Sequence, residues 1–322
     1  MAVDLVALPK AELHIHLESA ISRDLANDFA ARYQLPEPPR GPFPDQATFV
    51  RDYERVRDLI GSLTDLHAVA KDLAERQCAI GVRWTEVYFI PATYGDRLGS
   101  ADALVETVVD GLRSGGGPDA AGIVLGINRG LSRTAAWQSL KLAKRWHGRG
   151  VVALGLAGDE AGHPAAGFED LFAAAAEAGI PAVPHAGEGR ERSWVDEGID
   201  HLCPRRISHG LAAADDALTL ARIKAMGICL DLAPSSNVLL GLVPSLPEHP
   251  LPQLFRAGIP VSLSTDIPYF LGYDLVEELR RCALAWDLSD DEIVRLSAAA
   301  WDYALCPAQV RSAALADMPQ AP

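Results

Sequence analysis

The sequence of 322 residues lacks the clustered positive charge that nucleic acids bind. It contains 29 Lys and Arg against 43 Asp and Glu, which gives a formal net charge of −14 at neutral pH. No run of basic residues is longer than a pair such as Arg205-Arg206. Phosphate backbones bind to patches or stripes of Lys and Arg. We therefore expect a protein that does not bind nucleic acid.

Long apolar segments and paired cysteines are also missing. No stretch approaches the roughly 18 apolar residues that span a bilayer, and Met1–Lys10 has neither the basic nor the long apolar region of a signal peptide. The cysteines are odd in number, widely spaced and without a C-x-x-C pair: Cys78, Cys203, Cys229, Cys282 and Cys306. These absences predict a cytoplasmic protein with reduced thiols and no contact with membranes.

What the sequence does contain is a large apolar fraction, 49%, with only 22% charged residues, which excludes general disorder. Eight short apolar runs recur, and segments with apolar residues every three to four positions lie between them. The expected strands are Glu12–Leu17, Trp84–Ile90, Gly122–Ile127, Val151–Leu156, Pro181–His185, Arg206–His209, Ile228–Leu232 and Pro260–Ser264. The expected helices between them include Ala101–Leu112, Thr134–Trp146, Phe168–Ala178, Ala212–Met226 and Leu275–Trp286.

Apolar strands that alternate with helices indicate a parallel sheet covered by helices, and eight such units favour a (β/α)8 TIM barrel. An open doubly wound sheet would carry a G-x-G-x-x-G or G-x-x-x-x-G-K-[ST] turn after the first strand, and neither is present. Helical patterns over Phe49–Leu59 and Thr64–Ile80 predict an insertion after the first strand, placed as a lid at the barrel mouth. Helices over Leu288–Ala304 close the chain, and we interpret residues 1–322 as one domain.

Chemically capable side chains fall at the carboxyl ends of the expected strands, where barrel enzymes build their sites. His14 and His16 lie two apart, so a strand directs both to one side. His185, His209 and Asp266 end three further strands. A single histidine at a strand end is more often structural, but four of only nine histidines at equivalent points indicate a site. The other five are most simply surface residues: His67, His147, His163, His201 and His249.

Three histidines and an aspartate suit zinc, whereas calcium and magnesium prefer more oxygen ligands. Zinc lowers the pKa of its water to about 7, so these residues predict a hydrolytic reaction. Glu188 follows His185 by three residues and can shuttle a proton to the substrate. His209 can hold the attacking water or deprotonate it.

Several longer motifs carry a family resemblance. The segment Leu8-Pro-Lys-Ala-Glu-Leu-His-Ile-His-Leu-Glu18 is followed in order by Leu156-Ala-Gly-Asp-Glu160, His185-Ala-Gly-Glu188, Arg206-Ile-Ser-His-Gly210, Pro234-Ser-Ser-Asn237 and Ser264-Thr-Asp266. Together they resemble the adenosine deaminase-like family of the metal-dependent amidohydrolase superfamily. Counting the final match at Asp302–Pro307, the resemblance covers residues 8 to 307, which is almost the whole chain.

The resemblance implies a zinc-dependent deaminase that removes an exocyclic amino group and releases ammonia. It implies one Zn2+ per chain, bound by His14, His16, His185 and Asp266. Glu188 would protonate the ring nitrogen beside the reacting carbon, His209 would orient the water, and Asp266 would count among the catalytic residues. Gly158 would offer its backbone to the heterocycle.

Four departures from the family pattern concern the substrate. Ile267 stands where a second aspartate usually contacts the imidazole part of a purine, and Ser19 replaces a usual glycine. Glu18 replaces the aspartate common in enzymes for adenosine, and Tyr88 replaces a frequent arginine. We expect an adenosine-like purine nucleoside, a free base or a modified relative as substrate. The alternatives are a non-purine heterocycle, a zinc amidohydrolase that cleaves an amide or cyclic imine, and a metal-bearing binding protein without activity.

Overall fold

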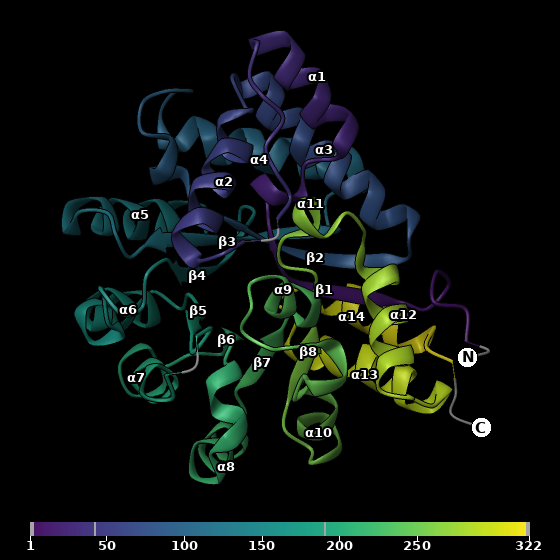
Figure 1. Ribbon diagram of the computed structural model, residues 1–322. Helices are drawn as coiled ribbons and strands as arrows, with labels where there is room; N and C mark the ends of the chain where they lie inside the picture. Colours follow the sequence, from purple (N-terminus) through teal and green to yellow (C-terminus); the bar gives the residue numbers. More distant parts are fainter. Residues whose placement is uncertain (1–2, 42, 190, 320–322) are drawn as a thin grey trace.

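The structure is a computed structural model that describes residues 3–41, 43–189 and 191–319. Eight parallel strands pair in chain order from β1 to β8 (Figure 1). They are β1 Lys10–His16, β2 Val82–Phe89, β3 Ala121–Asn128, β4 Val151–Ala157, β5 Ala182–Ala186, β6 Arg206–His209, β7 Cys229–Leu232 and β8 Val261–Leu263. Each expected strand is therefore present, with its ends within two residues of the expected ones.

The first and last strands meet, so the sheet forms a (β/α)8 barrel as predicted. Ile15 forms a parallel bridge with Asp266. The His16 N–H donates to the Asp266 carbonyl at 2.9 Å, and the Asp266 N–H donates to the His14 carbonyl at 3.0 Å. This seam lies at the carboxyl ends of the strands. It therefore sets three of the expected metal ligands side by side through the backbone alone.

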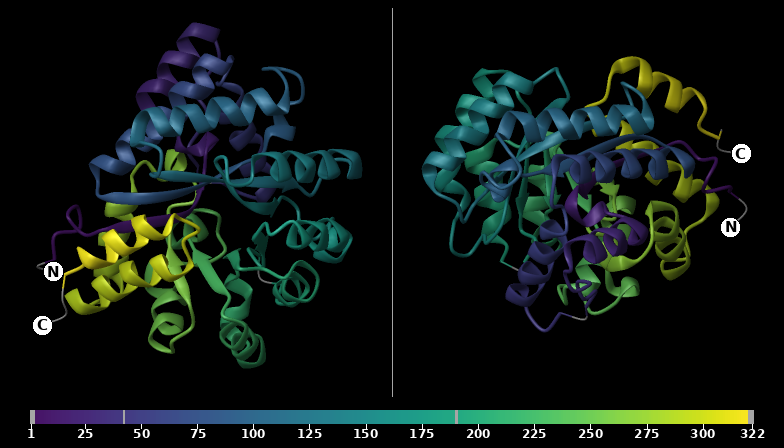
Figure 2. Two further views of the ribbon diagram at one scale, coloured as in Figure 1. Left: turned by 180° about the vertical axis from the view of Figure 1, so that it is seen from behind. Right: turned by 90° about the horizontal axis from the view of Figure 1, so that it is seen from above.

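Helices surround the strands on the outside of the barrel, as both views of Figure 2 show. Apolar side chains between the two layers form the main core, with Ile123, Leu125 and Leu154 fully buried beneath the helices. The helices of this ring and its loops are α4 Ala101–Gly116, α5 Arg133–Trp146, α6 Glu169–Glu177, α7 Ser193–Leu202, α8 Ala217–Met226, α9 Pro234–Leu239, α10 Leu251–Arg256, α11 Pro268–Leu271 and α12 Leu275–Ala285. Short 3-10 helices are η1 Glu18–Ala20, η2 Pro91–Tyr94, η3 Ala165–Phe168, η4 Leu211–Asp215 and η5 Leu246–Glu248.

The insertion after β1 consists of three helices, α1 Arg23–Tyr33, α2 Gln46–Asp58 and α3 Leu63–Ala79. The predicted patterns correspond to α2 and α3, and α3 packs against α4 in the outer ring. α1 was not expected from the sequence, and it buries only Ala26, Phe29 and Ala30. The position of α2 matters for function, because its side chains line the cavity at the barrel mouth.

The chain closes with α13 Asp290–Tyr303, as expected, and with a further helix, α14 Ala308–Ala316. Trp301 of α13 is fully buried and packs in one cluster with Ala11 and Trp84, which lie near the amino ends of their strands. These helices therefore cover the end of the barrel opposite the metal ligands. Among the described residues, no helix is long and apolar enough to cross a membrane.

Candidate active site

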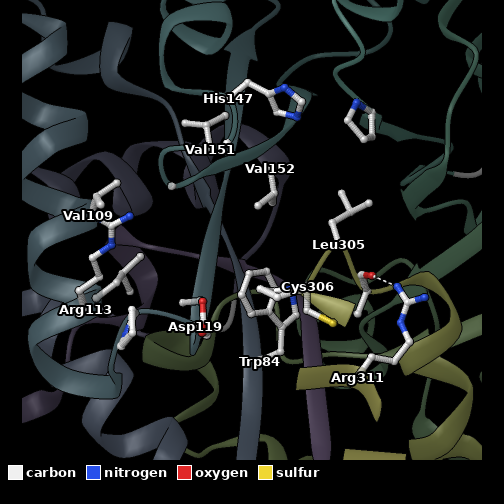
Figure 3. A pocket seen from close by; sticks show the side chains of 18 of the residues that line it. Trp84, Val109, Arg113, Asp119, His147, Val151, Val152, Leu305, Cys306 and Arg311 are labelled. Atoms are coloured by element: carbon white, nitrogen blue, oxygen red, sulfur yellow. Dashed lines mark hydrogen bonds between the residues drawn. The ribbon is translucent and has the colours of Figure 1, made fainter. Parts of the chain in front are cut away.

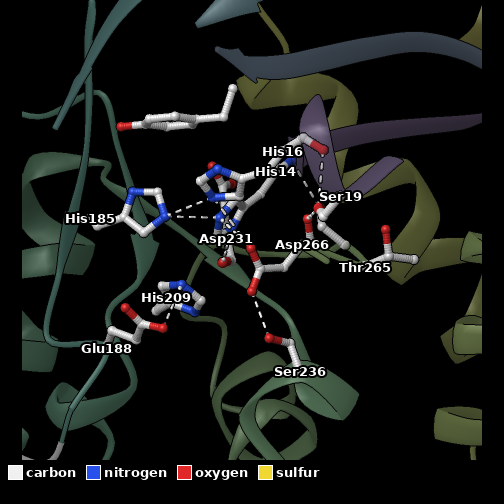
Figure 4. Close-up of polar contacts among 12 residues, drawn as sticks. His14, His16, Ser19, His185, Glu188, His209, Asp231, Ser236, Thr265 and Asp266 are labelled. Atoms are coloured by element: carbon white, nitrogen blue, oxygen red, sulfur yellow. Dashed lines mark hydrogen bonds and ion pairs between the residues drawn. The ribbon is translucent and has the colours of Figure 1, made fainter. Parts of the chain in front are cut away.

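Four expected ligands converge at the carboxyl end of the barrel (Figure 4). The Nε2 atom of His185 lies 3.2 Å from Nε2 of both His14 and His16. Oδ1 of Asp266 lies 3.3 Å from His14 Nε2 and 3.4 Å from His16 Nε2. Ligand atoms placed 2.0–2.1 Å from one zinc ion in a tetrahedron are separated by about 3.3–3.4 Å. The spacing of these atoms therefore fits a single zinc ion between them.

The other side of three of the four ligands, His14, His185 and Asp266, is held by a group that orients it. Nδ1 of His14 lies 3.3 Å from the Asp231 carbonyl, and Nδ1 of His185 lies 3.1 Å from the Leu156 carbonyl. A carbonyl only accepts, so each Nδ1 carries the proton and each Nε2 presents a lone pair to the centre. Ser236 donates to the second oxygen of Asp266 at 2.6 Å.

Burial keeps two of the expected ligand histidines, His16 and His185, neutral. Burial, with the neighbouring His14, lowers the pKa of His16 well below its usual value. The pKa of His185 is lowered well below its usual value by the same two causes. Both rings are therefore neutral near pH 7, which is the protonation state that binds a metal ion.

Glu188 and His209 stand beside the ligands, with His209 Nε2 3.7 Å from Glu188 Oε1. Burial, followed by the charge of Asp266, raises the pKa of Glu188 to about 8. The carboxyl group is therefore largely protonated near neutral pH, as a general acid requires. His209 holds a positive φ of 66°, which non-glycine residues adopt rarely and mainly at functional sites.

A second set of buried charges holds the turn that carries Glu188. Glu160 accepts hydrogen bonds from the backbone N–H groups of Gly187 at 2.8 Å and Glu188 at 3.0 Å. Arg129 donates to the His185 carbonyl at 2.7 Å. The turn is thus fixed on both sides by side chains from other strand ends, and Glu188 is aimed at the site without needing a partner of its own.

A cavity of about 160 Å3 opens beside the ligands, bordered by His16, Glu188 and His209 and covered by α2 through Phe49 and Tyr53. Glu18 lies within it, and its two oxygens accept the hydroxyls of Tyr53 at 2.8 Å and Tyr94 at 3.1 Å. Ligand pockets for larger molecules typically reach roughly 300–1,000 Å3. This cavity is therefore smaller than such pockets.

The residues expected to contact the substrate separate into two groups. Glu18, Gly158 and Ile267 line the cavity. Ser19 is not among its lining residues, because its buried hydroxyl donates towards the His16 and Asp266 carbonyls, at 3.1 and 3.2 Å. Ser19 therefore binds the backbone at the β1–β8 seam. Tyr88 is fully buried and packs edge-on against His185, with ring centroids 4.8 Å apart.

Some residues of the site were not recognised in the sequence. His249, expected at the surface, is 1% exposed, so that expectation was wrong. It contacts Asn237, which contacts His209. Asn237 belongs to the Pro234-Ser-Ser-Asn237 motif, so the sequence did point to this residue as part of the site. Tyr53 and Tyr94 carried no signal, since only the folding of α2 and η2 brings them to Glu18.

A larger hollow of about 550 Å3 lies at the other end of the barrel (Figure 3). Trp84, Val151 and Cys306 border it, near the amino ends of the strands and beside the chain's C-terminal helices. In the described part of the chain, the clusters of His and Asp that could bind a metal ion all lie at the opposite end of the barrel, beside the smaller cavity. The smaller cavity is therefore the candidate active site.

Comparisons with known proteins agree with this geometry. The sequence profile of the adenosine deaminase family matches residues 9–320. A putative adenosine/adenine deaminase of Streptomyces virginiae is 30% identical over 98% of this chain and 97% of its own length. The adenine deaminase of Caulobacter vibrioides is 34% identical over 90% and 87% of the two chains.

A solved structure resembles the fold equally well. The crystal structure of adenine deaminase from Arthrobacter aurescens superposes with a TM-score of 0.88 at 25% identity, covering 97% of this chain and 98% of that one. The match of profile, sequence and barrel runs over nearly the whole chain. The chain therefore belongs to the adenosine deaminase family of hydrolytic, metal-dependent deaminases within the amidohydrolase superfamily.

Proposed function

We propose that this chain is a zinc-dependent purine deaminase that replaces the exocyclic amino group of an adenine-like ring by oxygen and releases ammonia. The observation that carries the proposal is that His185 Nε2 and Asp266 Oδ1 each lie 3.2–3.4 Å from Nε2 of both His14 and His16, with Glu188 and His209 beside them. His14, His16, His185 and Asp266 would hold the ion. Zinc, when bound, supplies Lewis-acid chemistry and lowers the pKa of water to about 7.

The side chains of the cavity perform the remaining steps. Glu188, protonated near neutral pH, donates its proton to the ring nitrogen beside the carbon that water attacks. His209 orients that water at the site. Water forms the new C–O bond and gives up two protons, one that returns to Glu188 and one that goes to the amino group, so that the C–N bond breaks and the nitrogen leaves as ammonia. Gly158, with its positive φ of 110° and no side chain, lets the ring approach the backbone closely.

Among adenine-like rings we propose a free base as the preferred substrate. The cavity of about 160 Å3 is covered by Phe49 and Tyr53, which leaves little space beyond a bicyclic ring. Glu18 keeps lone pairs beyond those that receive the two tyrosine hydroxyls, so it can accept an N–H from the imidazole part of the ring. A nucleoside lacks that N–H, because its sugar occupies the nitrogen.

Ile267 favours a second candidate, a heterocycle without the ring acceptor that the usual aspartate binds. Ile267 is 2% exposed and borders the cavity with an apolar surface. We also propose that the enzyme is one domain over residues 1–322 and acts in the cytoplasm, where the five free cysteines found here stay reduced.

Metal analysis and ammonia release test the proposal together. We expect about one zinc per chain and ammonia from adenine faster than from adenosine, within a panel that includes 5′-modified adenosines, aminodeoxyfutalosine and pterins. Glu188→Gln should retain the metal and lose about 10²–10⁴-fold in kcat, because it lacks the transferable proton. A protein that binds no divalent ion, or that releases ammonia from no member of the panel with zinc added, contradicts the proposal.

A further inference from the structure

His249 lies inside the protein, directly after η5, and both of its ring nitrogens have partners. The backbone N–H of Leu251 donates to Nδ1 at 3.1 Å. Nε2 lies 3.1 Å from the side-chain oxygen of Asn237. A backbone N–H can only donate, so Nδ1 is an acceptor and the ring proton sits on Nε2. Burial lowers the pKa of His249 to about 4, which keeps the ring neutral.

The direction of this hydrogen bond determines the orientation of the Asn237 amide. Its oxygen accepts the proton of His249, so its NH2 group is turned to the other side, where Nδ1 of His209 lies 3.4 Å away. The main chain of Asn237 is also held, since its N–H donates to the Ala233 carbonyl at 2.9 Å and its carbonyl accepts from Leu242 at 2.9 Å. Asn237 is fully buried and has no freedom to exchange its two ends.

The amide in turn determines the tautomer of His209. An NH2 group donates, so Nδ1 of His209 is the acceptor, and the proton of the neutral ring must be on Nε2. Nε2 is the atom that faces the site, 3.7 Å from Glu188 (Figure 4). An N–H at this position donates to an oxygen and has no lone pair with which to take a proton.

We propose that Asn237 and His249 are positioning residues that hold His209 as its Nε2–H tautomer, so that His209 donates a hydrogen bond to the attacking water and Glu188 alone carries the proton. The inference rests on the proposed deaminase reaction for its kinetic consequence. The tautomer itself is a property of the folded chain. The sequence leaves two roles open for His209, holding the water or deprotonating it. The Nε2–H tautomer can hold the water but cannot deprotonate it.

Asn237→Asp is the sharpest variant, because it keeps the size of the side chain and removes its only donor. The carboxylate only accepts hydrogen bonds, so Nδ1 of His209 becomes protonated. The ring is then either the neutral Nδ1–H tautomer or a charged imidazolium with a proton on both nitrogens. We expect kcat to fall by about 10²-fold or more, as for other wrong-tautomer variants, with KM changed less than threefold.

His249 offers a matched set of variants. In His249→Gln the amide NH2 takes the place of Nε2–H and still donates to Asn237. His249→Glu has the same shape but presents an acceptor, which turns the Asn237 amide around. We expect the Gln variant to recover most of the kcat that the Glu variant loses. His201→Gln, an exposed histidine on α7, is the control for the substitution itself.

Histidine 15N NMR of the wild-type protein provides a readout independent of turnover. It should show His209 protonated on Nε2 and unprotonated on Nδ1, and Asn237→Asp should invert or double that protonation. A wild-type His209 with its proton on Nδ1 overturns the proposal, as does an Asn237→Asp variant that keeps kcat within twofold or loses it with an unchanged tautomer. If no substrate is turned over at all, the proposed function fails, and the NMR result still decides the tautomer.

Discussion

At the scale of single residues, hydrogen bonds and burial decide which atoms of the site carry a proton and which present a lone pair. His14 and His185 point Nε2 inward because a backbone carbonyl occupies each Nδ1. Glu188 has the opposite property, since burial and Asp266 keep its proton on. The same low-polarity surroundings therefore keep the rings of His16 and His185 neutral and the carboxyl group of Glu188 protonated.

Ile267→Asp tests the substrate preference at this scale. In the wild type, N7 of a purine meets an apolar wall at Ile267, so adenine and 7-deazaadenine should react with kcat/KM values within about threefold of each other. N7 and a carboxylate both accept, so the aspartate binds N7 only in its protonated form, and such a neutral hydrogen bond is worth about 0.5–1.5 kcal/mol. The adenine preference should then rise by about 2- to 10-fold.

Steady-state kinetics with both bases measure this ratio. Ile267→Asn is the matched comparison, since its amide N–H donates to N7 without first taking up a proton, and it should give a rise at least as large. A ratio that is the same in all three proteins means that Ile267 is only part of the wall and that N7 is recognised elsewhere or not at all.

At the scale of elements, function depends on where helices begin and end. The insertion places α2 over the cavity, and the short η2 brings Tyr94 to Glu18. The C-terminal α13 begins with a capping box, in which Ser289 and Glu292 exchange hydrogen bonds. Glu292 also binds Arg256 at the end of α10, at 2.7 Å, so one carboxylate joins two helices.

Glu292→Gln tests this joint through the dependence of stability on pH. Arg256 first, and then the Ser289 N–H, lower the pKa of Glu292 to about 2. The pKa of a Glu in the unfolded chain is about 4.3, and a group whose pKa is lower in the folded protein contributes its full stabilisation at pH values above 4.3. This contribution is lost as the pH falls towards 2. Gln keeps a capping oxygen but loses the charge, so we expect the variant to be about 1 kcal/mol less stable at pH 7.

Urea unfolding at pH 7, 5, 4 and 3 measures this prediction. The difference between wild type and Glu292→Gln should persist to about pH 5 and narrow between pH 4 and 3. The same change at Glu177, an exposed residue at the end of α6, controls for the loss of one negative charge. A difference that stays constant down to pH 3 shows that the charge of Glu292 contributes nothing.

At the scale of the whole molecule, the metal ligands and the barrel interior form one continuous polar structure. Arg206 is fully buried inside the barrel and binds Glu86 at 2.5 Å and Asp231 at 2.8 Å. The carbonyl of the same Asp231 orients His14. Since β1, β5 and the end of β8 each supply ligands, an ion there would also connect strands that meet at the barrel seam.

Metal removal should therefore destabilise the fold as well as abolish activity. An ion that binds the folded chain at 100 times its dissociation constant adds about 2.7 kcal/mol of stability. We expect a chelator to lower the Tm and added zinc to restore it in proportion to the logarithm of its concentration. His185→Ala should have a low Tm that zinc no longer raises. A wild-type Tm that is indifferent to both chelator and zinc contradicts a structural effect of the ion.

The sequence by itself determined the eight strands, the barrel and the four converging ligands. These features follow from local causes: apolar periods set the strands, and parallel strands bring their carboxyl ends to one rim. It could not place His249, because that ring becomes buried only when the segment after η5 packs beside α9. Nor could it show that Ser19 turns to the seam, or that Tyr53 and Tyr94 share Glu18. Those contacts join residues from different loops, and only the closed barrel decides which side chains meet there.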